Sequence, residues 1–195
     1  MSTTTLPAPP SPSAVTSLIT TSTSSASPDP VSALTLEVHH NLQHQHLWTS
    51  LIIHDVYTLS PTQSTPLISG QPPQAVYIHP DEQAYLLEQG ISADDIPVDR
   101  EWVIPTAQGQ SWTLRRLAGI FDSLPAETSG RDAAEEEHAG EDMSEKLAAH
   151  AEKKKEEDLW GGKRALIAMV NRKMGGDGTV VYYVVLEGAV KPRQN

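Results

Sequence analysis

Cysteine is missing from this sequence of 195 residues. Its absence excludes disulfide bonds, thiolate metal sites and a cysteine nucleophile. No segment approaches the ~20 apolar residues of a membrane-spanning helix, and the N-terminus lacks the basic start and continuous apolar core of a secretory signal. We therefore expect an intracellular protein with no signal peptide and no transmembrane segment.

Basic residues are also scarce. The chain has 14 Lys and Arg against 25 Asp and Glu, for a formal net charge of -11. Such a chain has no net basic field that would attract nucleic acid by itself, so any contact with RNA would be made beside a more basic partner. The candidate phosphate contacts are Arg115, Arg116, Lys163, Arg164, Lys191 and Arg193.

Two segments have a biased composition. Of the first 30 residues, 21 are Ser, Thr or Pro, which is too polar to offset the entropy of ordering, so we predict a disordered tail over residues 1–32. Residues 127–158 hold 12 acidic and 5 basic residues and are predicted to be a charged insertion, partly helical over 144–159. The rest of 33–195 is long enough for one core.

Outside these segments, the hydrophobic pattern predicts a small α/β domain with a mixed sheet. Two element boundaries have clear local signals. His79 and Pro80 mark the start of a helix that ends at Gly90, and Ser111 is expected to cap a second helix with Leu114 on its apolar face. The remaining expected elements are a helix over 34–50 and strands over 51–59, 74–78, 100–105, 164–170 and 179–186.

Histidines are the most conspicuous candidates for chemistry. His40 and His44 have the i, i+4 spacing that can bind zinc, but Asn41 stands where a zincin has glutamate, and no third ligand is evident. Solvated histidines on the polar face of a helix are the better interpretation. We expect no metal and no cofactor, and a metal-binding module using His40 and His44 is the weakest hypothesis.

Nothing in the sequence forms a catalytic constellation. His54 and Asp55 are expected on opposite faces of one strand, and helix capping accounts for His79. The glycines at 175–178 lack the Lys-Ser/Thr of a phosphate-binding loop and precede a strand. One enzymatic hypothesis stays open. The chain could be an independent RNA-processing nuclease that uses Lys163 with His79 or His54.

The segment TVVYYVVL, residues 179–186, contains no charge and no proline. A strand of this kind is an aggregation hazard if its edge is exposed, so it is either central in its own sheet or covered by another chain. We expect a partner interface here. Its candidate residues are Thr179, Val180, Val181, Tyr182, Tyr183, Val184, Val185, Leu186, Glu187 and Gly188.

Several segments together resemble the small structural subunit of the eukaryotic tRNA-splicing endonuclease in its fungal form. They are HNLQHQHLWTSLIIHD (40–55), PLISGQPPQAVYIHPDEQ (66–83), REWVIPT (100–106), WTLRRLAGIFDSL (112–124) and TVVYYVVLEGAVKPRQN (179–195). They cover essentially all of the expected folded part, in order. The tail and the acidic insertion do not contribute.

The resemblance implies the endonuclease fold and a heterotetramer in which each of two catalytic subunits pairs with a structural one. It also implies a role in excising introns from precursor tRNA in the nucleus. Terminal strands of two subunits would pair, with residues 179–186 as the pairing strand here. An acidic loop would insert into a neighbouring subunit, with Glu187 as the candidate.

Catalytic subunits of that family cleave RNA with a Tyr/His/Lys triad, without a metal. Lys163 or Arg164 stands where the resemblance implies the lysine, before an apolar strand. The tyrosine and histidine should lie just before residues 112–124, yet 86–121 contain neither. The resemblance therefore implies a non-catalytic subunit.

Overall fold

The computed structural model describes residues 30–125, 141–156, 160, 162–171, 179–187 and 189–192, together with Ala14 and Ser17. Their centre is a six-stranded sheet whose strands follow one another in chain order. Neighbouring strands are antiparallel except for one parallel pair, β3 and β4. The strands are β1 (Thr49–His54), β2 (Leu67–Gln71), β3 (Glu101–Ala107), β4 (Arg164–Asn171), β5 (Thr179–Leu186) and β6 (Ala189–Pro192). The expected mixed-sheet α/β fold is confirmed.

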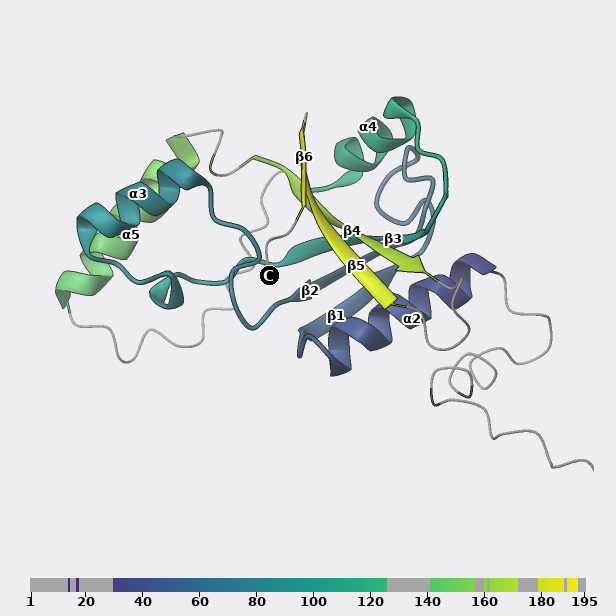
Figure 1. The fold of residues 1–195 in the computed structure, drawn as a ribbon. Helices are drawn as coiled ribbons and strands as arrows, with labels where there is room; N and C mark the ends of the chain where they lie inside the picture. The colour runs from purple at the N-terminus through teal and green to yellow at the C-terminus, as the bar shows by residue number, and fades with distance from the viewer. Residues whose placement is uncertain are drawn as a thin grey trace, which may run out of the picture.

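Helices cover both faces of this sheet (Figure 1). On one face, α2 (Pro30–His44) packs against a cluster that includes Ile68, Val103 and Leu166. On the other, α4 (Leu114–Ser123) packs against a cluster that includes Leu67 and Ile104. Two further helices, α3 (Pro80–Gln89) and α5 (Glu141–Glu156), lie side by side at one end of the sheet.

The predicted first helix is confirmed, but its bounds are wrong. It ends at His44 rather than Ser50, because the chain turns at Leu47, which adopts a positive φ of 56°. Thr49 and Ser50 already belong to β1, which ends at His54 rather than Leu59.

The second strand was predicted in the wrong place. Residues 74–78 form no strand, whereas β2 occupies Leu67–Gln71, inside the expected loop. Gly70 is typical of a loop in the sequence, but in the folded sheet it leaves room for two neighbouring side chains. A Cβ added there would lie 2.6 Å from Cδ2 of Leu51 and 3.2 Å from Cε3 of Trp48.

A buried glutamine organises the loop between β1 and β2. The Gln63 side chain is fully buried. Its Nε2 donates to the carbonyls of His54 and Thr65, both at 3.2 Å, and its Oε1 accepts the Leu59 N–H at 2.9 Å. One side-chain amide thus forms hydrogen bonds with three backbone groups around this turn.

The predicted start and end of α3 are confirmed. The His79 ring accepts a hydrogen bond from the Asp81 N–H, the Glu82 carboxylate accepts one from the His79 N–H, and Gly90 is left-handed with φ 67°. The cap predicted for α4 is wrong. Thr113, not Ser111, caps it, and Leu114 is 86% exposed instead of lying on its apolar face.

Most of the predicted tail and part of the insertion lie outside the described residues. Pro30, Val31 and Ser32, assigned to the tail, belong to α2. The expected partial helix within the insertion is α5, which begins three residues earlier than predicted. Among the described residues, none of the helices combines the length and the apolar character needed to cross a membrane.

Candidate partner interface

The two faces of β5 differ in their exposure. Tyr182 and Val184 point into the cluster shared with α2 and are 7% and 3% exposed. On the opposite face, Val181 is 44% exposed and Tyr183 is half-buried. The strand is therefore apolar on both faces, as its sequence suggested, but the face toward α2 is covered more completely than the opposite face around Val181 and Tyr183.

The exposed face of β5 continues onto β4. In the antiparallel register Tyr183 lies opposite Ile167, and Val181 lies opposite Met169. Ile167 and Met169 are also half-buried. These four side chains, Ile167, Met169, Val181 and Tyr183, are called the β4–β5 patch below. Such an apolar patch on a sheet face is a candidate docking surface.

The edge of the sheet beside this patch is β6. It pairs with Tyr183–Leu186 of β5, so over that stretch β5 is an inner strand and β6 is the outermost described strand. Glu187 is exposed, and its N–H donates to the Lys163 carbonyl at 3.1 Å. Gly188, the last predicted interface residue, lies outside the described residues.

Behind the patch, a polar network connects β5 to α2. The Tyr182 hydroxyl donates to Oδ1 of Asn41 at 2.6 Å, and Nδ2 of Asn41 donates to Oε1 of Gln45 at 2.7 Å. The His46 ring meets the Tyr182 ring edge-on at 5.0 Å. The segment around LQHQHLW thus fixes the inner face of the candidate interface strand, a link that no local sequence signal indicated.

The basic residues proposed for RNA contact have different surroundings. Arg115 is exposed. The Arg116 guanidinium lies 4.6 Å above the Trp112 ring, and Nζ of Lys163 donates to the Phe121 carbonyl at 3.0 Å. Nothing is described for Arg193 or for the side chain of Lys191.

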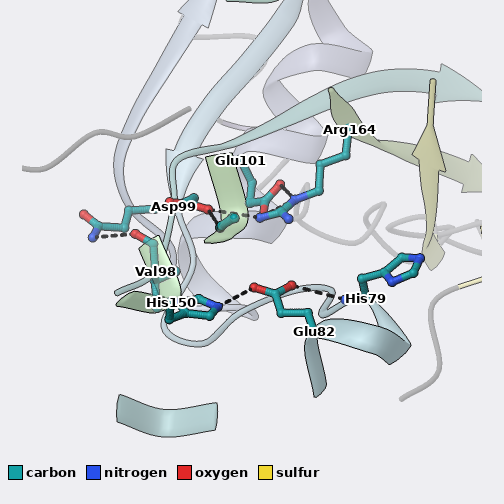
Figure 2. Close-up of polar contacts among 9 residues, drawn as sticks. His79, Glu82, Val98, Asp99, Glu101, His150 and Arg164 are labelled. Atoms are coloured by element: carbon teal, nitrogen blue, oxygen red, sulfur yellow. Dashed lines mark hydrogen bonds and ion pairs between the residues drawn. The ribbon is translucent and has the colours of Figure 1, made fainter. Parts of the chain in front are cut away.

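Arg164 is committed to an internal ion pair (Figure 2). Its Nε donates to both carboxylate oxygens of Glu101, at 2.8 and 3.1 Å, and its side chain is only 12% exposed. Burial alone would lower the pKa of Arg164, but the charge and hydrogen bonds of Glu101, together with the charge of Asp99, raise it above its ordinary value. This guanidinium therefore stabilises the start of β4.

The residues of the alternative nuclease hypothesis are not brought together. His54 Nε2 is 2.9 Å from Oγ of Ser69, and the His79 ring caps α3. In the part of the chain that the structure describes, no hydrogen bond or ion pair joins Lys163 to either histidine.

A metal site at the histidine cluster is not supported either. The rings of His40 and His44 are close, with centroids 4.4 Å apart. However, the described residues contain no group of three or more His, Cys, Asp or Glu side chains that could hold a metal ion.

The chain matches a known protein family over most of its length. The family model described as Sen15 protein matches residues 37–138 and 134–195, and so covers most of the chain. The chain belongs to the Sen15 protein family. Within the described residues, the match includes the C-terminal half of α2, the whole sheet and α5. The match thus reaches into the insertion, which did not contribute to the sequence resemblance.

This Sen15 family member is also similar to a protein of Neurospora crassa described as "Probable tRNA-splicing endonuclease subunit tsp-1". The two are 34% identical over 166 residues, which cover 84% of this chain and 66% of that relative. The chain thus spans somewhat less than two thirds of the relative's length.

Proposed function

We propose that this chain is a non-catalytic structural subunit of a tRNA-splicing endonuclease. It would pair with a catalytic subunit, in a heterotetramer that also holds further structural subunits, and support intron excision from precursor tRNA in the nucleus. Membership of the Sen15 family and the likeness to a probable endonuclease subunit carry this proposal.

The lack of a catalytic role is supported by residue types. Metal-independent RNA cleavage needs a general base and a general acid around the phosphate. Residues 86–121 contain neither tyrosine nor histidine, and Arg164 is neutralised by Glu101. Purified chain incubated alone with precursor tRNA should therefore leave it intact; cleavage that is lost in Lys163→Ala would favour the independent nuclease instead.

The partner's contact is proposed at the β4–β5 patch and the adjacent edge strand β6. The exposed side chain of Val181 and the half-buried ring of Tyr183 would be covered by the catalytic subunit, and the main chain of β6 would extend the sheet into it. Exposed Glu187 is the candidate for a second contact. Arg115, Arg116, Lys163 and Lys191, with Arg193, remain candidates for contact with precursor tRNA.

The decisive test is Val181→Asp, because a charge on this exposed face should block docking without entering the core. The matched control is Leu87→Asp on α3, at a side chain that is 73% exposed and distant from the patch in sequence. Both variants should unfold at the wild-type temperature. Co-purification with the catalytic subunit should be lost only in Val181→Asp, and undiminished assembly of that variant would rule out the patch.

A further inference from the structure

The helix α5 packs on a small apolar cluster of its own. Leu86, Ile91 and Ile96 are buried there, and Met143 and Leu147 of α5 lie against them. None of these residues belongs to the two clusters that join the sheet to α2 and α4. Within the described residues, α5 therefore makes its apolar contacts with the region around α3.

A buried charged contact joins the two helices. Nε2 of His150 on α5 lies 2.9 Å from Oε1 of Glu82 on α3, and the two residues are only 3% and 4% exposed. Figure 2 shows the Glu82 carboxylate between the His150 ring and the backbone of His79. Burial alone would raise the pKa of Glu82, but the hydrogen bond with His150 and the charge of Lys154 lower it below the ordinary value. Glu82 is thus a buried carboxylate that depends on α5 for its side-chain partner, while the His79 N–H provides a backbone hydrogen bond.

A second charged contact links α5 to the sheet. Nζ of Lys154 donates to Oδ2 of Asp99 at 2.6 Å, and Nη2 of Arg164 lies 3.6 Å from the same oxygen. The Asp99 carboxylate thus lies between a cation of α5 and the guanidinium at the start of β4, which also binds Glu101.

The remaining groups around His150 are aromatic or cationic. The ring of Tyr85 on α3 stacks at 6.3 Å, and that of Trp160 at 6.4 Å. Nζ of Lys153 lies 4.2 Å from the Tyr85 ring centroid. Among the residues that the structure describes, Glu82 is therefore the anionic group in contact with His150.

We propose that α5 is a latched lid on α3, held by the Glu82–His150 and Asp99–Lys154 contacts, which opens as a unit while the sheet stays folded. Proteins open locally in cooperative units, and regions with few apolar contacts open most easily. The cluster beneath α5 is small, so the charged contacts decide how often it opens. Opening uncovers Leu86, Ile91 and Ile96.

Native-state hydrogen exchange of the full chain tests this lid. In the wild type, α5 amides should exchange faster than those of β4 and β5. His150→Ala removes this contact without changing any residue of α3, and loss of a hydrogen bond to a charged group should speed exchange in α5 roughly tenfold or more. Rates in β4 and β5 should not change. Glu152→Ala, at an exposed position of the same helix, is the matched control.

A second variant distinguishes local opening of α5 from a general loss of stability. Lys154→Met keeps the apolar stem and removes the charge, so it should speed exchange in α5 alone, by less than His150→Ala does. Equal acceleration in α5 and in the sheet would show that no separate lid exists. Unchanged exchange of α5 in Lys154→Met and His150→Ala would show that these contacts do not hold it.

Acidity gives an independent readout of the same latch. The folded-state pKa of Glu82 lies below its ordinary value of 4.5. The stability that Glu82 contributes to the closed state is therefore complete above pH 4.5 and is lost as the pH falls through the folded-state pKa. After correction for intrinsic exchange, α5 should lose protection in this acidic range before β4 and β5 do. Simultaneous loss in all three would contradict the proposal.

Discussion

The hydroxyl of Tyr182 on β5 and the side-chain oxygen of Asn41 on α2 form a 2.6 Å hydrogen bond across 141 positions of sequence. Tyr182 and Asn41 are both buried, and Asn41 also donates to Gln45. The inner face of β5 is thus held to α2 by a specific polar contact as well as by apolar packing. This contact leaves Val181 and Tyr183 to face away from α2, toward the proposed partner.

Tyr182→Phe should lower the free energy of unfolding by about 1–2 kcal/mol, because it leaves the buried Asn41 oxygen without this donor. Urea denaturation measures the change. Tyr57→Phe, at a side chain that is 66% exposed, should be neutral. Wild-type stability of Tyr182→Phe would show that the network contributes nothing to folding.

Gln63→Ala should cost about 2–4 kcal/mol of stability, since three backbone groups of the β1–β2 loop lose their partner together. The measurement is again the free energy of unfolding in urea. Gln74→Ala, at an exposed loop position, is the matched control. Similar small effects in both variants would contradict the organising role of the buried amide.

Stability should also depend on His54. Burial first, and then the positive charge of Arg100, lower the pKa of His54 below its ordinary value of 6.5. The unfolded chain therefore binds this proton more tightly. The stability that His54 contributes is complete above pH 6.5 and falls as the pH drops toward the folded-state pKa.

His54→Gln should therefore flatten the decrease in unfolding free energy between about pH 7 and pH 5. A residual decrease should remain, because burial, together with the charges of His40 and His44, lowers the pKa of His39 as well. Urea unfolding at a series of pH values measures both slopes. Identical slopes in wild type and variant would show that His54 does not contribute.

Elements with local signals were predicted well from the sequence. The start and end of α3 are determined by His79, Pro80 and Gly90, whose preferences act within one helical turn. β2 was missed because Gly70 and the flanking prolines are typical of a loop. Gly70 leaves room for the side chains of Leu51 and Trp48, which approach it only in the folded sheet.

The candidate partner interface could also be predicted only in part, because its strand has a local signal whereas its exposed face depends on tertiary packing. The composition of residues 179–186 marks a strand with two apolar faces, but only the packing of α2 determines which face is covered. Aspartate at Tyr182 or Val184 would disrupt the core, whereas aspartate at Val181 tests the surface. The contact between Glu82 and His150 joins residues 68 positions apart, and no local pattern indicates it.

The single parallel pair in the sheet also has a consequence for the rate of folding. β1, β2 and β3 form one set of antiparallel neighbours along the chain, and β4, β5 and β6 form another. Among the described strands, the two sets are hydrogen-bonded to each other only where β3 pairs with β4, and the ion pair beside that contact joins residues 63 positions apart. Closing so long a loop costs entropy before its contacts form. Each half can therefore assemble early from neighbouring strands, and the joining of β3 to β4 is expected to limit the rate at which the complete sheet appears.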